Sequence, residues 1–173
     1  AYAGRVLDEP RYVAAAREAA DFLLGTLRRD CRLLHRYRAG HVAIPGLLDD
    51  HAFLALGLLE LYEATFEPRW LREALTTIRS ASERFGDASG AFFLSPVDGE
   101  QLVVRPEDPF DGALPSGAFV ATQVLLRLGH LTGDAALTER ALKALRAQGG
   151  LLAQAPAAST SALVALDLAL GPW

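Results

Sequence analysis

The chain has no methionine, a single cysteine and few aromatic side chains (8%) among its 173 residues. The lone cysteine, Cys31, excludes a disulfide framework, so a reducing compartment and a cytoplasmic location are expected. No apolar run approaches the roughly 20 residues of a membrane span, and no signal-peptide pattern opens the chain. The absence of methionine, even at position 1, indicates a fragment of a longer protein.

Neither sign of charge is in large excess, because the formal net charge is −4. We therefore expect neither nucleic acid nor an anionic membrane as a partner. None of the histidines has metal-ligand spacing, so we expect no metal and no cofactor. His35 and His41 would meet across a hairpin in a suitable register, although chance also explains their spacing. With 51% hydrophobic residues, the chain forms one domain over 1–173 that buries a real core.

What the chain does have is helical periodicity of two kinds. Segments 50–62, 116–128 and 159–170 are apolar around the whole helix, which requires cover on every side. Segments that start at Pro10, Pro68 and about Ala135 carry one apolar stripe each, for example Tyr12, Ala16, Ala19, Leu23 and Leu27. This alternation predicts an all-α domain of three helical hairpins, in which outer helices cover inner ones, as part of an α/α toroid.

Long connections lead from each outer helix to the next inner helix, and the reverse connections are short. Two long connections suggest β-hairpins: 91–95 with 101–105 around Asp98-Gly99, and more weakly 32–37 with 41–44 around Ala39-Gly40. We therefore expect the inner helix starts near Asp50, Ser116 and Ser159 to lie on one side, beside the Asp98-Gly99 hairpin. Long loops on one rigid face commonly carry function.

Several motifs resemble a known family. Residues 45–53 (PGLLDDHAF), 58–65 (LLELYEAT), 111–117 (DGALPSG) and 90–93 (GAFF) resemble stretches of the YyaL-type, or spermatogenesis-associated thioredoxin-domain, proteins. The resemblance implies the C-terminal half of a six-hairpin α/α toroid, similar to glycosidases and N-acylglucosamine 2-epimerases. His51 replaces the usual tyrosine, and Ala118-Phe119 replaces Asn-Ser. The family's thioredoxin-like domain is absent, so no redox role carries over.

Asp49, Asp50, His51 and Asp111 are the candidate catalytic residues. Carboxylates from neighbouring inner helices form an acid/base pair for glycoside cleavage if they face one cavity. His51 follows the Asp pair, and histidine is the usual proton shuttle near neutral pH. The structural alternatives are an N-cap for the Asp pair, an Asp-Gly turn for Asp111 and a capping-turn role for His51.

The candidate substrate-binding residues belong to the long connections and to one helix start. Arg36 and Arg105 suit an anionic sugar, Phe92 and Phe110 suit stacking on a sugar ring, and Ser116 begins an inner helix. Solvated charge, hairpin core and helix capping are the respective alternatives. Asp167 interrupts an apolar helix and needs a partner if it is buried.

Two functions follow from these patterns. The first is a carbohydrate-processing or carbohydrate-binding protein, a hydrolase or epimerase, that takes a sugar-type small molecule. The second is a non-catalytic helical module that binds a ligand or a protein, which the loss of Asn-Ser at 118–119 favours. Three hairpins leave apolar edges open, so we also expect a homo-oligomer or docking onto a missing half of the toroid.

Overall fold

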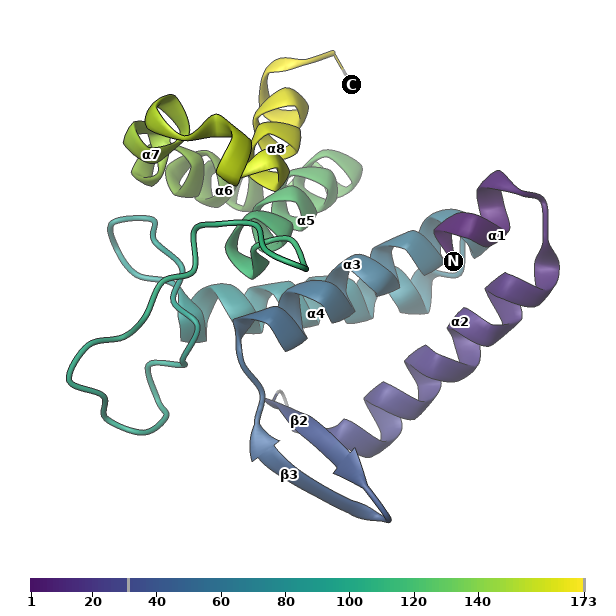
Figure 1. The fold of residues 1–173 in the computed structure, drawn as a ribbon. Coiled ribbons are helices and arrows are strands. Elements are labelled where there is room, and N and C mark those ends of the chain that lie inside the picture. The colour runs from purple at the N-terminus through teal and green to yellow at the C-terminus, as the bar shows by residue number, and fades with distance from the viewer. Residues whose placement is uncertain (31, 173) are drawn as a thin grey trace.

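The computed structural model describes residues 1–30 and 32–172, and it is mostly helical with a small antiparallel sheet (Figure 1). The lone cysteine, Cys31, lies outside the described residues. The helices are α1 (Tyr2–Val6), α2 (Pro10–Phe22), α3 (Leu48–Thr65), α4 (Pro68–Phe85), α5 (Gly117–Thr132), α6 (Ala135–Ala147), α7 (Gly149–Gln154) and α8 (Thr160–Leu170). Short helical turns follow α2 and precede α8, namely η1 (Leu23–Leu27) and η2 (Pro156–Ala158). The strands are β1 (Arg28–Arg29), β2 (Arg32–Arg38) and β3 (His41–Pro45).

The main helices begin and end where the local sequence predicts. Pro10 and Pro68 occupy the first turns of α2 and α4, where a missing N–H costs no hydrogen bond. Asp134 caps α6 by accepting from the Ala136 N–H at 3.0 Å. Gly133 ends α5 with φ of 69°, a left-handed conformation that glycine adopts without steric cost.

The helices form two layers in the alternating order expected from the sequence. Inner helix α3 packs on inner helix α5, and α5 packs in turn on α8. Outer helix α4 contacts α3 and α5, and outer helix α6 contacts α5 and α8. Leu58 and Leu59 of α3 and Leu125 and Leu128 of α5 are fully buried between these layers. The all-α prediction with an inserted β-hairpin is therefore confirmed.

The hairpin that the sequence suggested more weakly is the one that forms. β2 pairs with β3 in antiparallel register, from Leu34 opposite Pro45 to Arg38 opposite His41. The turn residues Ala39 and Gly40 have φ of 48° and 83°, and two positive values are typical of a tight two-residue hairpin turn. The register places Arg38, and not His35, opposite His41, so the two histidines do not meet.

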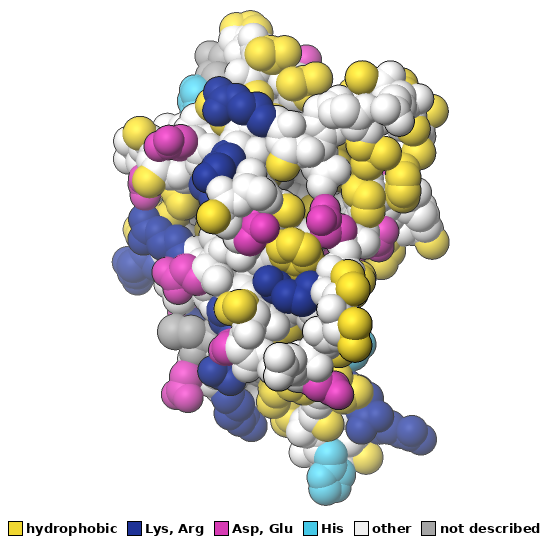
Figure 2. All heavy atoms as spheres, turned by 90° about the vertical axis from the view of Figure 1, so that its left-hand side faces the viewer, with side chains coloured by type: hydrophobic (Ala, Val, Ile, Leu, Met, Phe, Trp, Pro, Cys, Tyr) yellow, Lys and Arg dark blue, Asp and Glu magenta, His cyan; other side chains and the backbone are white. Residues whose placement is uncertain are grey.

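The hairpin predicted around Asp98-Gly99 is wrong. Residues 93–115 contain no strand, and the one isolated bridge nearby joins Gly86 to Phe92. Side chains hold this loop instead. The Asp98 carboxylate accepts from Arg84 at 3.1 Å, a bond that lowers the pKa of Asp98, and it also pairs with Arg32 at 2.7 Å. On the face that carries the loop, basic and acidic side chains are interspersed (Figure 2).

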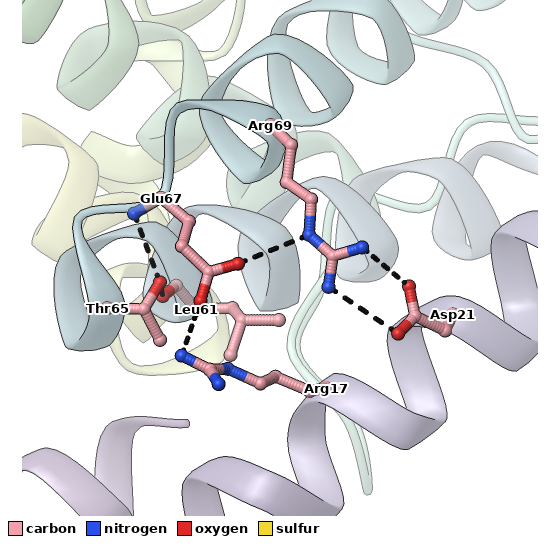
Figure 3. Close-up of polar contacts among 6 residues, drawn as sticks. All are labelled: Arg17, Asp21, Leu61, Thr65, Glu67 and Arg69. Carbon is pink, nitrogen blue, oxygen red and sulfur yellow. Dashed lines mark hydrogen bonds and ion pairs between the residues drawn. The ribbon is translucent and has the colours of Figure 1, made fainter.

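Polar contacts hold α2 to the turn between α3 and α4 (Figure 3). Arg69 at the start of α4 donates to Asp21 of α2 at 3.1 Å and pairs with Glu67 at 3.3 Å. Arg17 of α2 also pairs with Glu67. Ion pairs thus hold one side of α2 to the start of α4. The apolar stripe of α2 lines the cavity that is described below. None of the described helices is long and apolar enough to cross a membrane.

Candidate functional site

The amino-terminal ends of the inner helices meet on one side of the molecule. The Asp111 carboxylate, in the long loop, accepts from the Ser116 N–H at 2.9 Å and from the Ser161 N–H at 2.7 Å. It therefore joins the starts of α5 and α8. The start of α3 lies against the start of α5, because a Cβ added to Gly117 would overlap the Asp49 carboxylate. The three helix starts are thus grouped as predicted, whereas the Asp98-Gly99 hairpin that we expected beside them does not form.

A cavity of about 750 Å³ opens between α2, β2 and α3. Its walls are mostly apolar and include Phe53 and Leu54 of α3 and the α2–η1 residues Ala16, Ala19, Leu23 and Leu27. Its polar lining includes His35 of β2, Asp49 and Asp50 at the start of α3, and Glu60. His35, Asp49 and Asp50 gather at the amino-terminal end of α3, so this end of the cavity can do acid/base chemistry.

Asp49 is a half-buried carboxyl with an unsatisfied oxygen. Its Oδ1 is inaccessible to solvent and has no hydrogen-bond partner among the described residues. Burial raises the pKa of Asp49, and the negative charges of Asp108 and Asp50 raise it further. A carboxyl in such a place holds its proton more strongly than an ordinary aspartate, as a general acid requires.

Asp50, the neighbouring carboxyl, is held by two different elements. Its Oδ2 accepts from the Leu47 N–H at 2.8 Å, so Asp50 satisfies a free backbone donor at the start of α3. Both of its oxygens lie 3.0 Å from Nδ1 of His35 in β2. The capping role that we weighed for the Asp pair thus belongs to Asp50, and the adjacent Asp49 is left for other chemistry.

Asp111 does not line the cavity, because its carboxylate is bonded to backbone N–H groups at the starts of α5 and α8. Besides the two backbone bonds, it accepts from the Thr160 hydroxyl at 3.0 Å and from the Ser161 hydroxyl. Burial raises the pKa of Asp111, but these hydrogen bonds outweigh it and the net shift is downward. Ser116 does not cap α5 with its side chain, since its hydroxyl donates to the Asp108 carbonyl at 2.6 Å.

His51 is fully buried and is not brought to the cavity. Its Nδ1 lies 2.8 Å from the Leu47 carbonyl oxygen, and its ring packs on Phe85 with centroids 4.9 Å apart. Nε2 is buried without a hydrogen-bond partner among the described residues. Burial lowers the pKa of His51, so the neutral ring is favoured. The observed surroundings are those of a core histidine bonded across the capping turn.

The candidate substrate-binding residues lie apart from the cavity lining as well. Arg105 stacks on the Phe93 ring at 4.4 Å and donates to the Ser95 carbonyl at 2.6 Å, so it braces the loop. Phe92 is buried under Arg140, at 4.1 Å from its guanidinium carbon. Arg36 is exposed on β2, and Phe110 is half exposed in the loop. Asp167 is exposed, so its predicted need for a buried partner does not arise.

Sequence reasoning missed the contribution of His35, Phe53 and Asp108 to this site. His35 follows Leu34, which pairs with Pro45 just before α3 begins. Because the hairpin runs directly into the helix, its base must lie beside the Asp pair, and this signal was available in the sequence. The proximity of Asp108 to Asp49 depends on the path of the long loop, which no local pattern revealed. Among the described residues, no group of three or more His, Asp or Glu side chains is arranged to hold a metal ion.

Comparison with known proteins gives a clear relationship. The chain is 37% identical to human spermatogenesis-associated protein 20 over 145 residues, which cover 77% of this chain and 18% of that protein. The chain is homologous to a segment of spermatogenesis-associated protein 20. The mouse protein of that name is 36% identical over the same share, and an uncharacterised protein of Caenorhabditis elegans is 29% identical over 92% of this chain and 23% of its own length.

The chain spans less than a quarter of the length of these curated relatives. No family model matches it. The names of these relatives state no reaction, substrate or partner. The relationship therefore supports the family part of the resemblance drawn from the motifs, and the chemistry has to be argued from the site itself.

Proposed function

We propose that this chain carries part of a carbohydrate-processing site at the amino-terminal ends of its inner helices. The observation that carries the proposal is the unequal state of two adjacent carboxyls at one end of the cavity. Asp49 has a raised pKa and an unsatisfied buried oxygen, whereas Asp50 is held by hydrogen bonds to Leu47 and His35. Glycoside cleavage needs one carboxyl that donates a proton and one that stays ionised.

The surrounding fold is compatible with this chemistry. Inner helices bring their positive amino-terminal ends to one place, where an ionised carboxylate is stabilised. Phe53 and Leu54 give the cavity an apolar wall, and the apolar face of a sugar ring packs well on such a surface. The resemblance to six-hairpin toroids points to the same substrate class through the fold, as an analogy.

In the proposed hydrolysis, Asp49 donates its proton to the leaving oxygen as the glycosidic C–O bond breaks, and a water molecule that gives a proton to the Asp50 carboxylate bonds to the anomeric carbon. Asp50 acts as the ionised partner, and His35 holds its orientation through Nδ1. Gly117 has a positioning role, because any side chain there would displace the Asp49 carboxylate. His51, Asp111, Arg105 and Ser116 support the site by holding the elements that surround it.

A ligand screen by saturation-transfer NMR with neutral, amino and acidic mono- and oligosaccharides tests the proposal. We expect binding that Asp49→Asn and Gly117→Ala each weaken at least tenfold. Asp8→Asn is the matched control, since Asp8 is exposed and its φ of 50° suits asparagine equally. Absence of sugar binding in the full-length protein, or equal binding by Asp49→Asn, would overturn the proposal.

The second candidate function is a non-catalytic interaction module. It is favoured by the predominance of alanine and leucine in the cavity walls, and by the structural use of Asp111, Arg105 and Phe92. In the same screen, this second function predicts that neither the unaltered chain nor Asp49→Asn binds sugar.

A further inference from the structure

We propose that the outward face of the β2–β3 hairpin binds an extended acidic peptide segment through Arg36 and Arg38. These two side chains and His41 form what we call the basic face of the hairpin. None of the three lines the cavity, so the proposal does not rest on the proposed carbohydrate chemistry at the start of α3.

The strand register brings the basic face together. Arg36 stands opposite Ala43, and Arg38 stands opposite His41. Residues directly opposite one another in an antiparallel pair lie on the same face, and so do residues two apart along one strand. Arg36, Arg38 and His41 therefore share one face of the hairpin, and all three are exposed.

The other face of the hairpin is turned toward the helices. Leu33 is buried, and the Tyr37 ring packs edge-on against Phe22 of α2 with the ring centroids 5.2 Å apart. His35 of the same face lies 3.0 Å from the Asp50 carboxylate. Because the odd-numbered residues of β2 contact the body of the molecule, the basic face points away from it.

The basic face lacks carboxylates of its own. Residues 32–48 contain neither Asp nor Glu, although the whole chain has a formal net charge of −4. At the base of the hairpin, Arg32 pairs with Asp98 at 2.7 Å. No carboxylate within residues 1–30 and 32–172 forms such a pair with Arg36 or Arg38. Two neighbouring guanidinium groups are thus left without a counter-charge, which an anionic partner would supply.

The hairpin projects beyond the helical layers, and both chain ends lie away from it (Figure 1). The basic face is therefore not an edge of the helical array left open at a chain end. Its composition also differs from that of a surface packed permanently against another part of a protein, because permanent interfaces resemble a hydrophobic core. Exposed arginines suit a polar partner that binds and dissociates.

Charge and spacing indicate the chemistry of that partner. A guanidinium group binds a carboxylate through two parallel hydrogen bonds. Arg36 and Arg38 are about 6.8 Å apart along the strand, and carboxylates at alternate positions of an extended peptide have the same spacing. Proteins that bind a single strand of nucleic acid stack its bases on aromatic rings. Tyr37, the aromatic residue of the hairpin, packs on α2 instead, so the peptide is the better match.

Fluorescence anisotropy of a labelled peptide of alternating glutamate and threonine, titrated with the full-length protein, tests the proposal. We expect saturable binding at low ionic strength that weakens as sodium chloride is added, because salt screens exposed charges. Arg36→Gln and Arg38→Gln should each weaken binding by roughly fivefold, the effect of losing one exposed ion pair. Arg72→Gln is the matched control, since Arg72 is an exposed arginine of α4, and this variant should bind like the unaltered protein.

Charge reversal adds a gain of binding that loss of folding cannot imitate. The double variant Arg36→Glu with Arg38→Glu should release the glutamate peptide and bind a peptide of alternating lysine and threonine, which the unaltered protein does not bind at this face. Its circular dichroism should be unchanged, because both positions are exposed.

Three results would overturn the proposal. The first is a full-length protein that does not bind the glutamate peptide, since another part of the protein would then cover the basic face. The second is equal binding by the unaltered protein and both arginine variants, which would assign the peptide to another surface. The third is tighter binding of a labelled oligothymidylate of equal charge, which would make a nucleic acid the partner.

Discussion

Three aspartates near the inner helix starts illustrate how surroundings decide the chemistry of one residue type. Asp111 accepts four hydrogen bonds, and its pKa falls in spite of burial. Asp50 closes a helix turn and contacts His35. Asp49, which lies beside glycine backbone and near Asp108, has the opposite shift. The presence of hydrogen-bond donors, and not burial alone, separates the three roles.

Replacing Asp111 should cost stability, because its carboxylate holds α5 and α8 together. We expect Asp111→Ala to lower the free energy of unfolding by roughly 2–3 kcal/mol, since buried donors lose a charged acceptor. Asp111→Asn, which keeps one carbonyl oxygen, should cost less. Urea unfolding measures both values, and a loss below about 0.5 kcal/mol for Asp111→Ala, the level typical of surface positions, would contradict this role.

His51 should make stability depend on pH. Burial lowers its pKa in the folded state below the ordinary value of 6.5, so the unfolded chain binds the proton first as the pH falls. The free energy of unfolding therefore decreases below about pH 6.5 and is regained as the pH rises through that value. The difference between the unaltered chain and His51→Leu, measured by urea unfolding from pH 5 to 8, should show this slope. A flat difference would mean that the ring titrates normally.

At the scale of elements, local turn chemistry predicted the wrong hairpin. Asp98-Gly99 is the stronger turn signal, yet Gly99 does not adopt the positive φ of a tight hairpin turn, and Asp98 pairs with Arg84 and Arg32. Val97 donates its N–H to the Arg84 carbonyl at 2.7 Å, so the backbone bonds to α4 and not to a facing strand. Tertiary contacts with a neighbouring helix outweighed the dipeptide preference.

The helices were predictable because their periodicity is long and their ends are marked by Pro10, Pro68 and Asp134. The sequence also brought Asp49 and Asp50 to the correct helix start. The sequence did not reveal the cavity, because the cavity depends on how α2 and β2 pack against α3. Nor did it separate Asp49 from Asp111, since that difference arises from donors on α8 about 50 residues away.

The hairpin between β2 and β3 offers a direct test at this scale. Ala39 has φ of 48°, a conformation that costs a residue with a Cβ roughly 1–2 kcal/mol relative to glycine. We expect Ala39→Gly to raise the free energy of unfolding by about 0.5–1 kcal/mol, because the greater freedom of glycine when unfolded offsets part of the gain. Gly40→Ala, at φ of 83°, should have the opposite sign. Thermal unfolding distinguishes them, and destabilisation by Ala39→Gly would contradict the turn geometry.

For the whole molecule, the parallel inner helices are what link fold to function. Their amino-terminal ends converge, the long loop ties them together through Asp111, and the Asp pair lies at the edge of the cavity. The same parallel order leaves the cavity and one exposed helix at opposite ends of the array.

Asp49 should hold its proton more strongly than Asp111 does, because Asp49 is buried beside other carboxylates and Asp111 accepts hydrogen bonds. Carbon-13 NMR titration of the aspartate carboxyl groups, assigned with Asp49→Asn and Asp111→Asn, measures this directly. We predict a pKa for Asp49 above its ordinary value of 3.8 and a pKa for Asp111 below that value. A pKa for Asp49 at or below that of Asp111 would contradict the account, because the site would then contain no carboxyl fit to donate a proton.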